Sequence, residues 1–172
     1  NVMGKHPSVK SWQSESTSGV HPLEGWFGGT EPRNVAIDCA KSNLVVLDID
    51  PRSGGNSSFE MLLELAPELA KVSTVESRTG DYPQGRGRHI YFRAAKGKKY
   101  FTNLARLGLS GIDIKHNGYV LAPNSIHKSG VCYEWVEGRE PWSIQVAEVP
   151  EDLVDLITKK DQIADFASRS IS

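Results

Sequence analysis

A run of apolar residues that ends in two carboxylates places the strongest constraint on how this chain folds. In LVVLDIDPRSGG, residues 44–55, four apolar residues lead directly into Asp48 and Asp50, with Ile49 between them. A near-continuous apolar run predicts a central strand over 44–50 that is covered on both faces. Residues two apart in a strand share a face and lie about 7 Å apart along the chain, so the two carboxylates project together.

The closeness of Asp48 and Asp50 needs a physical reason, because two neighbouring carboxylates repel each other unless a cation lies between them or one is protonated. Two divalent metal ions about 3.5 to 4 Å apart meet that need and are the usual device for phosphoryl and nucleotidyl transfer. The alternative is that the two acids mark the solvated end of a strand before the turn at 51–55. An additional carboxylate expected near Asp48 and Asp50 would favour a metal site over a solvated strand end.

A third acid favours the metal site. Asp113 lies between apolar residues in GIDIK and is also expected on a strand, where Lys115 shares its face. Three strand-borne acids suit magnesium, which prefers oxygen ligands and keeps other positions for water and phosphate.

An Asn-Gly pair, the preferred two-residue turn, predicts a hairpin within 111–123. In that register Asp113 faces Ala122 and Lys115 faces Val120. These small neighbours are expected to leave room for a ligand.

One histidine has a context that favours a role in binding phosphate. In GRGRHIYF, strand alternation puts His89, Tyr91 and Arg93 on one face, and Ile90 and Phe92 in the core. The preceding stretch GDYPQGRG is predicted to be a glycine-rich loop, which lets backbone and basic side chains approach a phosphate closely. The alternative, a structural histidine, is the commoner role for a lone residue of this type.

Turn residues and apolar periodicity predict the other elements. Pro67 should kink or split a helix over 56–72, which is expected to begin with a capping box at 57–60. The expected elements are short helices around Trp12 and Trp26, strands at 34–37, 44–50, 73–78, 89–93, 111–116, 119–123 and 132–136, the helix at 56–72 and a final helix from Pro150. This mixture predicts the α+β (α/β) class, with a mixed, largely antiparallel sheet flanked by helices.

Charge is distributed unevenly along the chain. The net charge of −1 argues against a protein that simply coats nucleic acid, but no acid occurs between positions 81 and 113. The residues of that gap that we expect to follow a template backbone are Arg93, Lys96, Lys98, Lys99 and Arg106. The alternative is a solvated basic loop.

Cysteines and hydropathy limit the class of protein. Cys39 and Cys132 are far apart and lack CxxC spacing, which argues against a cysteine zinc site and favours a reducing cytoplasm. No apolar run has the length of a membrane span, so no membrane association is expected.

Three motifs occur in an order that resembles a known family. LDIDPRSGG, then GRHIYF, then GIDIKHNGYVLAPNSIHKSG with a following YEW is similar to the bifunctional DNA primase/polymerase domain of the archaeo-eukaryotic primase superfamily. That family is found on replication proteins of phages and plasmids. The resemblance covers about residues 27–137, and its specificity lies in the order of the three motifs.

The resemblance implies roles for particular residues. Asp48, Asp50 and Asp113 would hold Mg²⁺ or Mn²⁺ in a two-metal site, and His89 would contact the phosphates of the incoming nucleotide. The residues that would bind the nucleotide with His89 are Arg86, Arg88, Lys115, Ser125 and His127. The implied organisation is an N-terminal α/β part at 1–43, a catalytic core at 44–140 and a C-terminal helix at about 150–158, followed by a polar tail or linker at 159–172.

The function that the resemblance implies is template-directed nucleotidyl transfer. The expected partners are nucleoside triphosphates, a single-stranded DNA template with its primer, and a helicase domain elsewhere in a longer protein. We expect a monomeric domain in the cytoplasm of a bacterial or phage-infected cell. Two alternatives stay open: a restriction-type nuclease using Asp113-x-Lys115, and a DNA-binding module without catalysis. No GxxxxGK[ST] motif occurs, so this chain alone is not expected to be an ATP-driven helicase.

Overall fold

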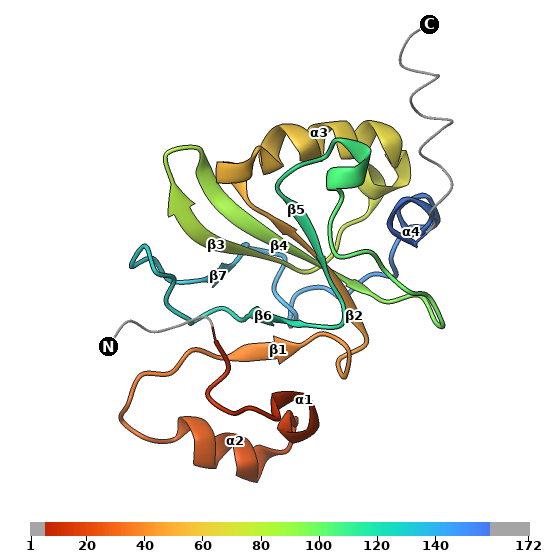
Figure 1. The fold of residues 1–172 in the computed structure, drawn as a ribbon. Coiled ribbons are helices and arrows are strands. Elements are labelled where there is room, and N and C mark those ends of the chain that lie inside the picture. Colours follow the sequence, from red (N-terminus) through yellow and green to blue (C-terminus); the bar gives the residue numbers. More distant parts are fainter. Residues whose placement is uncertain (1–5, 159–172) are drawn as a thin grey trace, which may run out of the picture.

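Within residues 6–158, which the computed structural model describes, the chain forms a five-stranded sheet, a two-stranded sheet and the helices that cover them (Figure 1). The elements are α1 (Trp12–Glu15), α2 (Val20–Phe27), β1 (Ala36–Asp38), β2 (Leu44–Ile49), η1 (Pro51–Ser53), α3 (Gly55–Leu65), η2 (Pro67–Lys71), β3 (Glu76–Tyr82), β4 (Gly85–Arg93), η3 (Ala105–Leu107), β5 (Ile112–Lys115), β6 (Tyr119–Leu121), β7 (Glu134–Trp135) and α4 (Glu151–Thr158). The α+β class is confirmed, and the tail at 159–172 lies outside the described residues.

The strand predicted over 44–50 lies inside the larger sheet. The strand order is β5-β2-β4-β3-β7, and every neighbouring pair is antiparallel. On one face Leu47 packs into a core formed with α3 and α4. On the other face Val46 packs with Tyr91 and Val120, which brings the β1–β6 sheet against β2 and β4. A central strand covered on both faces is therefore confirmed.

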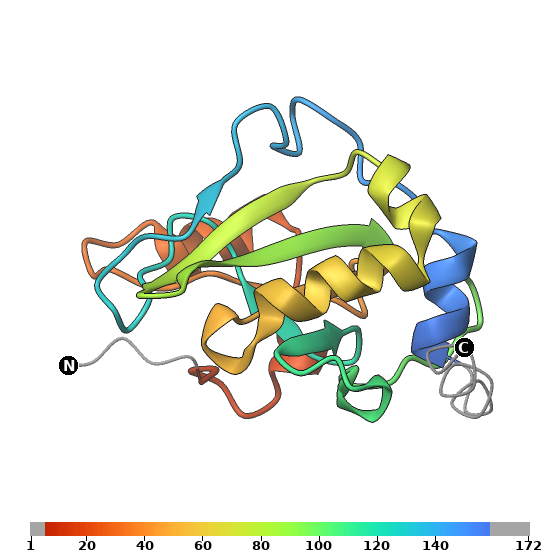
Figure 2. The same ribbon diagram turned by 90° about the horizontal axis from the view of Figure 1, so that it is seen from above.

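The covering elements are divided between these faces. Figure 1 shows α3 above the larger sheet, with β1, β6, α1 and α2 below it. Figure 2 shows α3 lying along β4, with α4 near the end of that helix. The backbone N–H of Glu68 in η2 donates to the carboxylate of Asp152 at 2.8 Å, which joins α4 to the chain after α3.

The predicted helix at 56–72 is split as expected, but its capping box is wrong. α3 ends at Leu65, and Pro67 begins η2. The residue that precedes the helix is Gly54, with φ +85°, and no side chain caps the first turn. The cause is the tight turn η1, after which a Cβ on Gly55 would lie 2.6 Å from the backbone oxygen of Asp50. The helix therefore begins before the serines that were expected to cap it.

The predicted hairpin within 111–123 is also wrong, because its two strands belong to different sheets. β5 pairs with β2, and β6 pairs with β1. Asp113 therefore faces Asp48 instead of Ala122. The physical reason is burial: Ile112 joins the core under α3, whereas the β1–β6 sheet packs on the opposite face of β2. An Asn-Gly turn preference is weaker than the burial of these two apolar surfaces.

The register predicted for Lys115 changes in the same way. It faces Val46 of β2, whereas Val120 faces Ile37 of β1. Lys115 therefore lies on the larger sheet, next to the strand that bears Asp48.

The glycine-rich loop predicted at 80–87 is mostly strand. β3 runs to Tyr82 and β4 begins at Gly85, with a register shift between Arg78 and Asp81. Gly80 has no room for a side chain, since a Cβ there would lie 2.5 Å from Cε1 of His127. Glycine inside a strand often marks such a close approach, which is what this position requires.

The remaining predictions differ only in their bounds. The short helices around Trp12 and Trp26 are α1 and α2, and the final helix begins at Glu151. The strand predicted at 34–37 is observed at 36–38, and the one predicted at 132–136 is reduced to 134–135.

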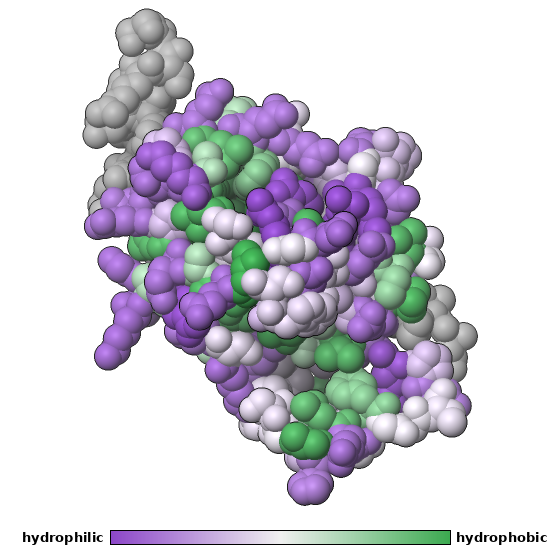
Figure 3. Space-filling view, turned by 180° about the vertical axis from the view of Figure 1, so that it is seen from behind, coloured by the Kyte–Doolittle hydropathy of each residue, from purple (hydrophilic) through white to green (hydrophobic). Residues whose placement is uncertain are grey.

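Apolar side chains gather over α1 and α2 in Figure 3, where a hollow of about 520 Å³ is lined partly by Trp12, Trp26 and Tyr119. Within the described part of the chain, no helix is long and apolar enough to cross a membrane.

Candidate active site

Three of the predicted site residues form one row across three neighbouring strands. Asp48 of β2 lies directly opposite Asp113 of β5 on one side and opposite His89 of β4 on the other. Directly opposed residues in a sheet share a face, with Cβ atoms about 4.5 to 5.5 Å apart. The sheet therefore brings together positions 48, 89 and 113, which the sequence separates widely.

The row borders a cavity of about 210 Å³ at the end of β2. Its lining combines the three acids and His89 with the turn after β2 and with side chains from β3, β4 and the segment before β7. The lining residues are Asp48, Ile49, Asp50, Arg52, Ser53, Thr79, Tyr82, Gly87, His89, Gly111, Asp113 and Tyr133. Four of the predicted catalytic or metal-binding residues thus share one cavity.

Asp50 is paired with an arginine that the sequence analysis did not select. Nε and Nη2 of Arg52 donate to the Asp50 carboxylate at 3.1 and 2.5 Å, and the backbone N–H of Arg52 donates at 3.0 Å. The guanidinium lies over the ring of Tyr82, 4.3 Å from its centroid. The hydrogen bonds from the Arg52 side chain lower the pKa of Asp50. Asp50 is therefore ionised and already neutralised.

Lys115 forms ion pairs with the other two acids, Asp48 and Asp113. Its Nζ lies 2.8 Å from Oδ2 of Asp113 and 3.8 Å from Oδ2 of Asp48. Burial acts to lower the pKa of Lys115, but the hydrogen bond to Asp113 and the charge of Asp48 raise it above its ordinary value. The lysine is thus charged and lies between two carboxylates that directly oppose each other.

His89 is buried, with only 4% of its surface exposed. Its Nε2 lies 3.5 Å from Oδ1 of Asp48, and its Nδ1 lies 3.4 Å from Oη of Tyr91, which in turn lies 3.0 Å from Oγ of Ser77. Ile90 is in the core as predicted. The face of β4 that bears His89 is covered at Tyr91, which packs with Val46 and Val120 between the two sheets. This face is open at the cavity, next to His89, and again at Arg93 at the other end of β4.

Two tyrosines that sequence reasoning missed form walls of the cavity. Tyr133 is 2% exposed, and its ring centroid lies 5.9 Å from that of His89 and 5.9 Å from that of His127, with the rings tilted against each other. Burial, and then the charge of Asp48, raise the pKa of Tyr133, so it is a neutral phenol. Tyr82 is held by His127, whose Nε2 lies 2.9 Å from its Oη. The YEW stretch contains Tyr133, but no spacing rule links it to the acids.

Ser125 and His127 lie behind this cavity and do not line it. The hydroxyl of Ser125 accepts from the backbone N–H of Val35 at 3.0 Å, and it is fully buried. The backbone N–H of Ser129 donates to Nδ1 of His127 at 3.1 Å. His127 thus contacts the cavity through Tyr82 and Tyr133.

The two arginines before His89 do not line the cavity that contains the three aspartates. Arg88 faces the α3 side of the sheet, where its Nε donates to Glu76 at 2.6 Å and its guanidinium lies 4.8 Å from the ring centroid of Phe59. Arg86 donates to the Glu134 carboxylate at 2.5 Å and to the backbone oxygen of Cys132 at 2.7 Å. These contacts hold β3, β4 and β7 together.

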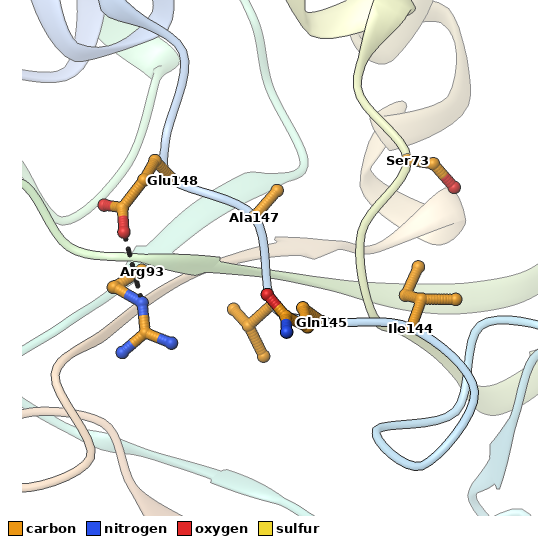
Figure 4. Close-up of a pocket in the computed structure, with 7 residues that line it drawn as sticks. Ser73, Arg93, Ile144, Gln145, Ala147 and Glu148 are labelled. Atoms are coloured by element: carbon orange, nitrogen blue, oxygen red, sulfur yellow. Dashed lines mark ion pairs between the residues drawn. The ribbon is translucent and has the colours of Figure 1, made fainter.

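The residues predicted to follow a template lie at the other end of β4. Arg93 pairs with Leu44 in the sheet, at the opposite end of β2 from Asp48 and about 13 Å along β4 from His89. Figure 4 shows Arg93 directed at Glu148, and their side chains are 3.2 Å apart. They border an open hollow of about 740 Å³ along residues 144–148.

The other basic residues of this region are of two kinds. Lys96, Lys98 and Lys99 are exposed in the loop after β4. Arg106 lies over the ring of Phe101, 3.8 Å from its centroid, and donates to the backbone oxygen of Leu156 near the end of α4. The three lysines are therefore available to a polyanion, whereas Arg106 is engaged in packing.

The donor chemistry of the cavity suits a hard divalent cation, since three carboxylates line it. Among residues 6–158, however, no three side chains of the ligand types are gathered closely enough to hold a metal ion. Arg52 pairs with Asp50, and Lys115 pairs with Asp113, so two of the three carboxylates already have a cation of the protein as partner. A metal ion could bind these carboxylates only if the side chains of Arg52 and Lys115 moved away from them. The metal assignment therefore stays a prediction.

Comparison with known proteins gives the family. The family model described as "Bifunctional DNA primase/polymerase, N-terminal" matches residues 1–152, which extends beyond both ends of the stretch whose motifs resemble that family. No curated protein matches the chain. The matched residues include the three acids, His89 and Lys115. This chain belongs to the bifunctional DNA primase/polymerase family.

Proposed function

We propose that this chain is a template-directed nucleotidyltransferase that makes or extends primers in DNA replication. The observation that supports the proposal best is the row of Asp113, Asp48 and His89 beside Asp50 in one cavity of a chain from this family. In the reaction, a 3′-hydroxyl attacks the α-phosphate of a nucleoside triphosphate. A bond forms between the 3′-oxygen and the α-phosphorus. The bond between the α-phosphorus and the oxygen that bridges to the β-phosphorus breaks. Pyrophosphate and the hydroxyl proton leave.

The acids of the cavity are proposed to hold Mg²⁺ or Mn²⁺ through Asp48, Asp50 and Asp113. When bound, these ions would activate the attacking hydroxyl and stabilise the charge on the leaving pyrophosphate. His89 has its Nε2 on the cavity side of the ring and is proposed to contact the phosphates. Lys115 is a charged donor beside the acids and is proposed to bind the triphosphate by electrostatic attraction.

The template is proposed to contact the exposed lysines of the loop after β4. Lys96, Lys98 and Lys99 are exposed, and no acid lies nearby in the sequence. Phosphate contacts of this type bind single strands without reading sequence and weaken with salt. This proposal assigns Arg93 and Arg106 a smaller part, because other groups of the protein already engage their side chains.

One assay tests the proposed reaction. The protein is incubated with a primed single-stranded template, Mn²⁺ and ribo- or deoxyribonucleoside triphosphates, and the labelled strand is followed by electrophoresis. Wild-type protein should extend it, Asp113→Asn should not, and Asp81→Asn should extend it normally. Asp81 is a matched control because it is an exposed acid of β3 outside the cavity. Metal-dependent degradation of the strand would instead support the nuclease with Asp113 and Lys115, and binding alone would support a DNA-binding module.

A further inference from the structure

Arg52 lines the cavity with a side chain that the hydrophobic core does not need. It belongs to the turn η1, for which Asp50 provides the cap by accepting the backbone N–H of Arg52 at 3.0 Å. Any residue other than proline supplies that N–H. The side chain is 41% exposed, so it contributes little to the core. The guanidinium therefore adds little to the packing of the core, and yet two groups hold it in one place.

Those two groups orient the guanidinium toward the acids. The carboxylate of Asp50 accepts from both Nε and Nη2, and the ring of Tyr82 lies beneath the guanidinium plane. A carboxylate that accepts two hydrogen bonds in this way has few lone pairs left for a divalent cation. The positive charge of Arg52 would also repel that cation at close range. Arg52 and a metal ion at Asp50 thus exclude each other.

A displaced guanidinium would still lie in the cavity, because its backbone is fixed between Asp50 and Ser53 and the Tyr82 ring provides a surface for it. The ligand that brings negative charge to this cavity is the triphosphate. A guanidinium matches a phosphate with two parallel hydrogen bonds, in the same geometry that it uses for a carboxylate. The same side chain can therefore exchange Asp50 for a phosphate without leaving the site.

We propose that Arg52 is an exchangeable counterion: it neutralises Asp50 in the metal-free protein and, when a divalent ion takes Asp50, becomes a ligand of the nucleotide triphosphate. This inference rests on the proposed nucleotidyl transfer. It adds a residue to the nucleotide site and predicts that metal and nucleotide bind cooperatively, because the metal releases the arginine that the nucleotide needs.

The first measurement is Mn²⁺ binding to the free protein, by calorimetry or by the electron paramagnetic resonance of the free ion. Arg52→Ala should bind Mn²⁺ about two- to fivefold more tightly than wild type, because an ion pair of surface strength no longer competes. Arg52→Lys should lie between the two. Arg78→Ala is the control, since Arg78 is an exposed arginine of β3 that does not line the cavity. Unchanged or weaker Mn²⁺ binding by Arg52→Ala overturns the counterion role.

The second measurement is the affinity for a fluorescent nucleoside triphosphate at saturating Mn²⁺. Arg52→Ala should weaken it about tenfold or more, as expected for the loss of hydrogen bonds to a charged group, with partial rescue by Arg52→Lys. An unchanged nucleotide affinity overturns the second role. Both readouts are independent of catalysis, so a wild-type protein that binds Mn²⁺ and nucleotide but incorporates nothing refutes only the proposed reaction. Failure of wild type and Arg52→Ala alike to bind Mn²⁺ overturns the exchange.

Discussion

The two faces of β2 and β4 differ in how they treat charge. On the α3 face, Leu47 and Ile90 are buried, and the charges of Arg88 and Glu76 neutralise each other. On the other face, the same strands present Asp48 and His89 to a cavity with further carboxylates. The first face satisfies its charges within the protein, whereas the second has more carboxylates than cations of its own. A substitution on the α3 face should therefore change stability, whereas a substitution of the adjacent residue on the cavity face should change catalysis.

The largest expected effect lies on the cavity face. Asp48→Asn keeps the size of the side chain and removes the charge at the centre of the row, and should lower nucleotide incorporation about 10³-fold. The melting temperature should change little, because the variant removes both the repulsion between Asp48 and Asp113 and the attraction of Asp48 to Lys115. Single-turnover incorporation and thermal unfolding measure the two effects. Wild-type incorporation by this variant would remove Asp48 from the proposed metal site.

The neighbouring residue on the α3 face should show the reverse. Leu47 is fully buried, so Leu47→Ala should lower the free energy of unfolding by about 2 to 5 kcal/mol through lost contacts and a cavity. Denaturant unfolding gives this value. At a temperature where the variant is folded, its Mn²⁺ affinity should equal that of wild type. A large loss of Mn²⁺ affinity would show that the two faces are coupled.

Arg88 tests the comparison at a charged residue. Arg88→Met should destabilise the protein by about 1 to 3 kcal/mol, because Glu76 stays buried with Arg139 as its remaining partner. Nucleotide KM should be unchanged, since Arg88 points away from the cavity. Steady-state kinetics beside urea unfolding separates the two. A raised KM with unchanged stability would restore the nucleotide-binding role that the motif suggested.

The smallest effect is expected at the far end of β4. Arg93→Ala removes an exposed pair with Glu148 and should cost about 1 kcal/mol of stability or less. Its affinity for single-stranded DNA should follow the salt dependence of wild type. Lys98→Ala, the matched loop variant, should reduce the salt slope by about 0.7. Fluorescence anisotropy over a range of salt concentrations checks both, and a larger change in Arg93→Ala would contradict the smaller role given to it.

The residues that could be predicted are those whose signal is local. The apolar run before Asp48 marks a central strand, and Pro67 divides the helix after it. Strand alternation and carboxylate spacing selected the three acids, its sequence context selected His89, and the order of the family motifs supported all four; the structure places them on one cavity. That they act in catalysis remains a prediction.

The features that could not be predicted depend on contacts between distant segments. The pairing of β5 with β2 is decided by burial under α3, against a strong local preference for a hairpin. Tyr133 reaches the cavity from the segment before β7, and no periodicity points to it. Gly80 gave a turn signal, but its role is to make room for the ring of His127. The ion pair of Arg52 arises from the geometry of a turn that composition does not specify.

The row of Asp113, Asp48 and His89 has a consequence for folding kinetics. Its members come from three strands that meet only when β4 and β5 have both docked on β2. Closing the long loops between these strands is slow compared with forming α3, whose contacts are local. During refolding, helical structure should therefore develop before the cavity can bind any ligand, and the site should mature together with the completed central sheet.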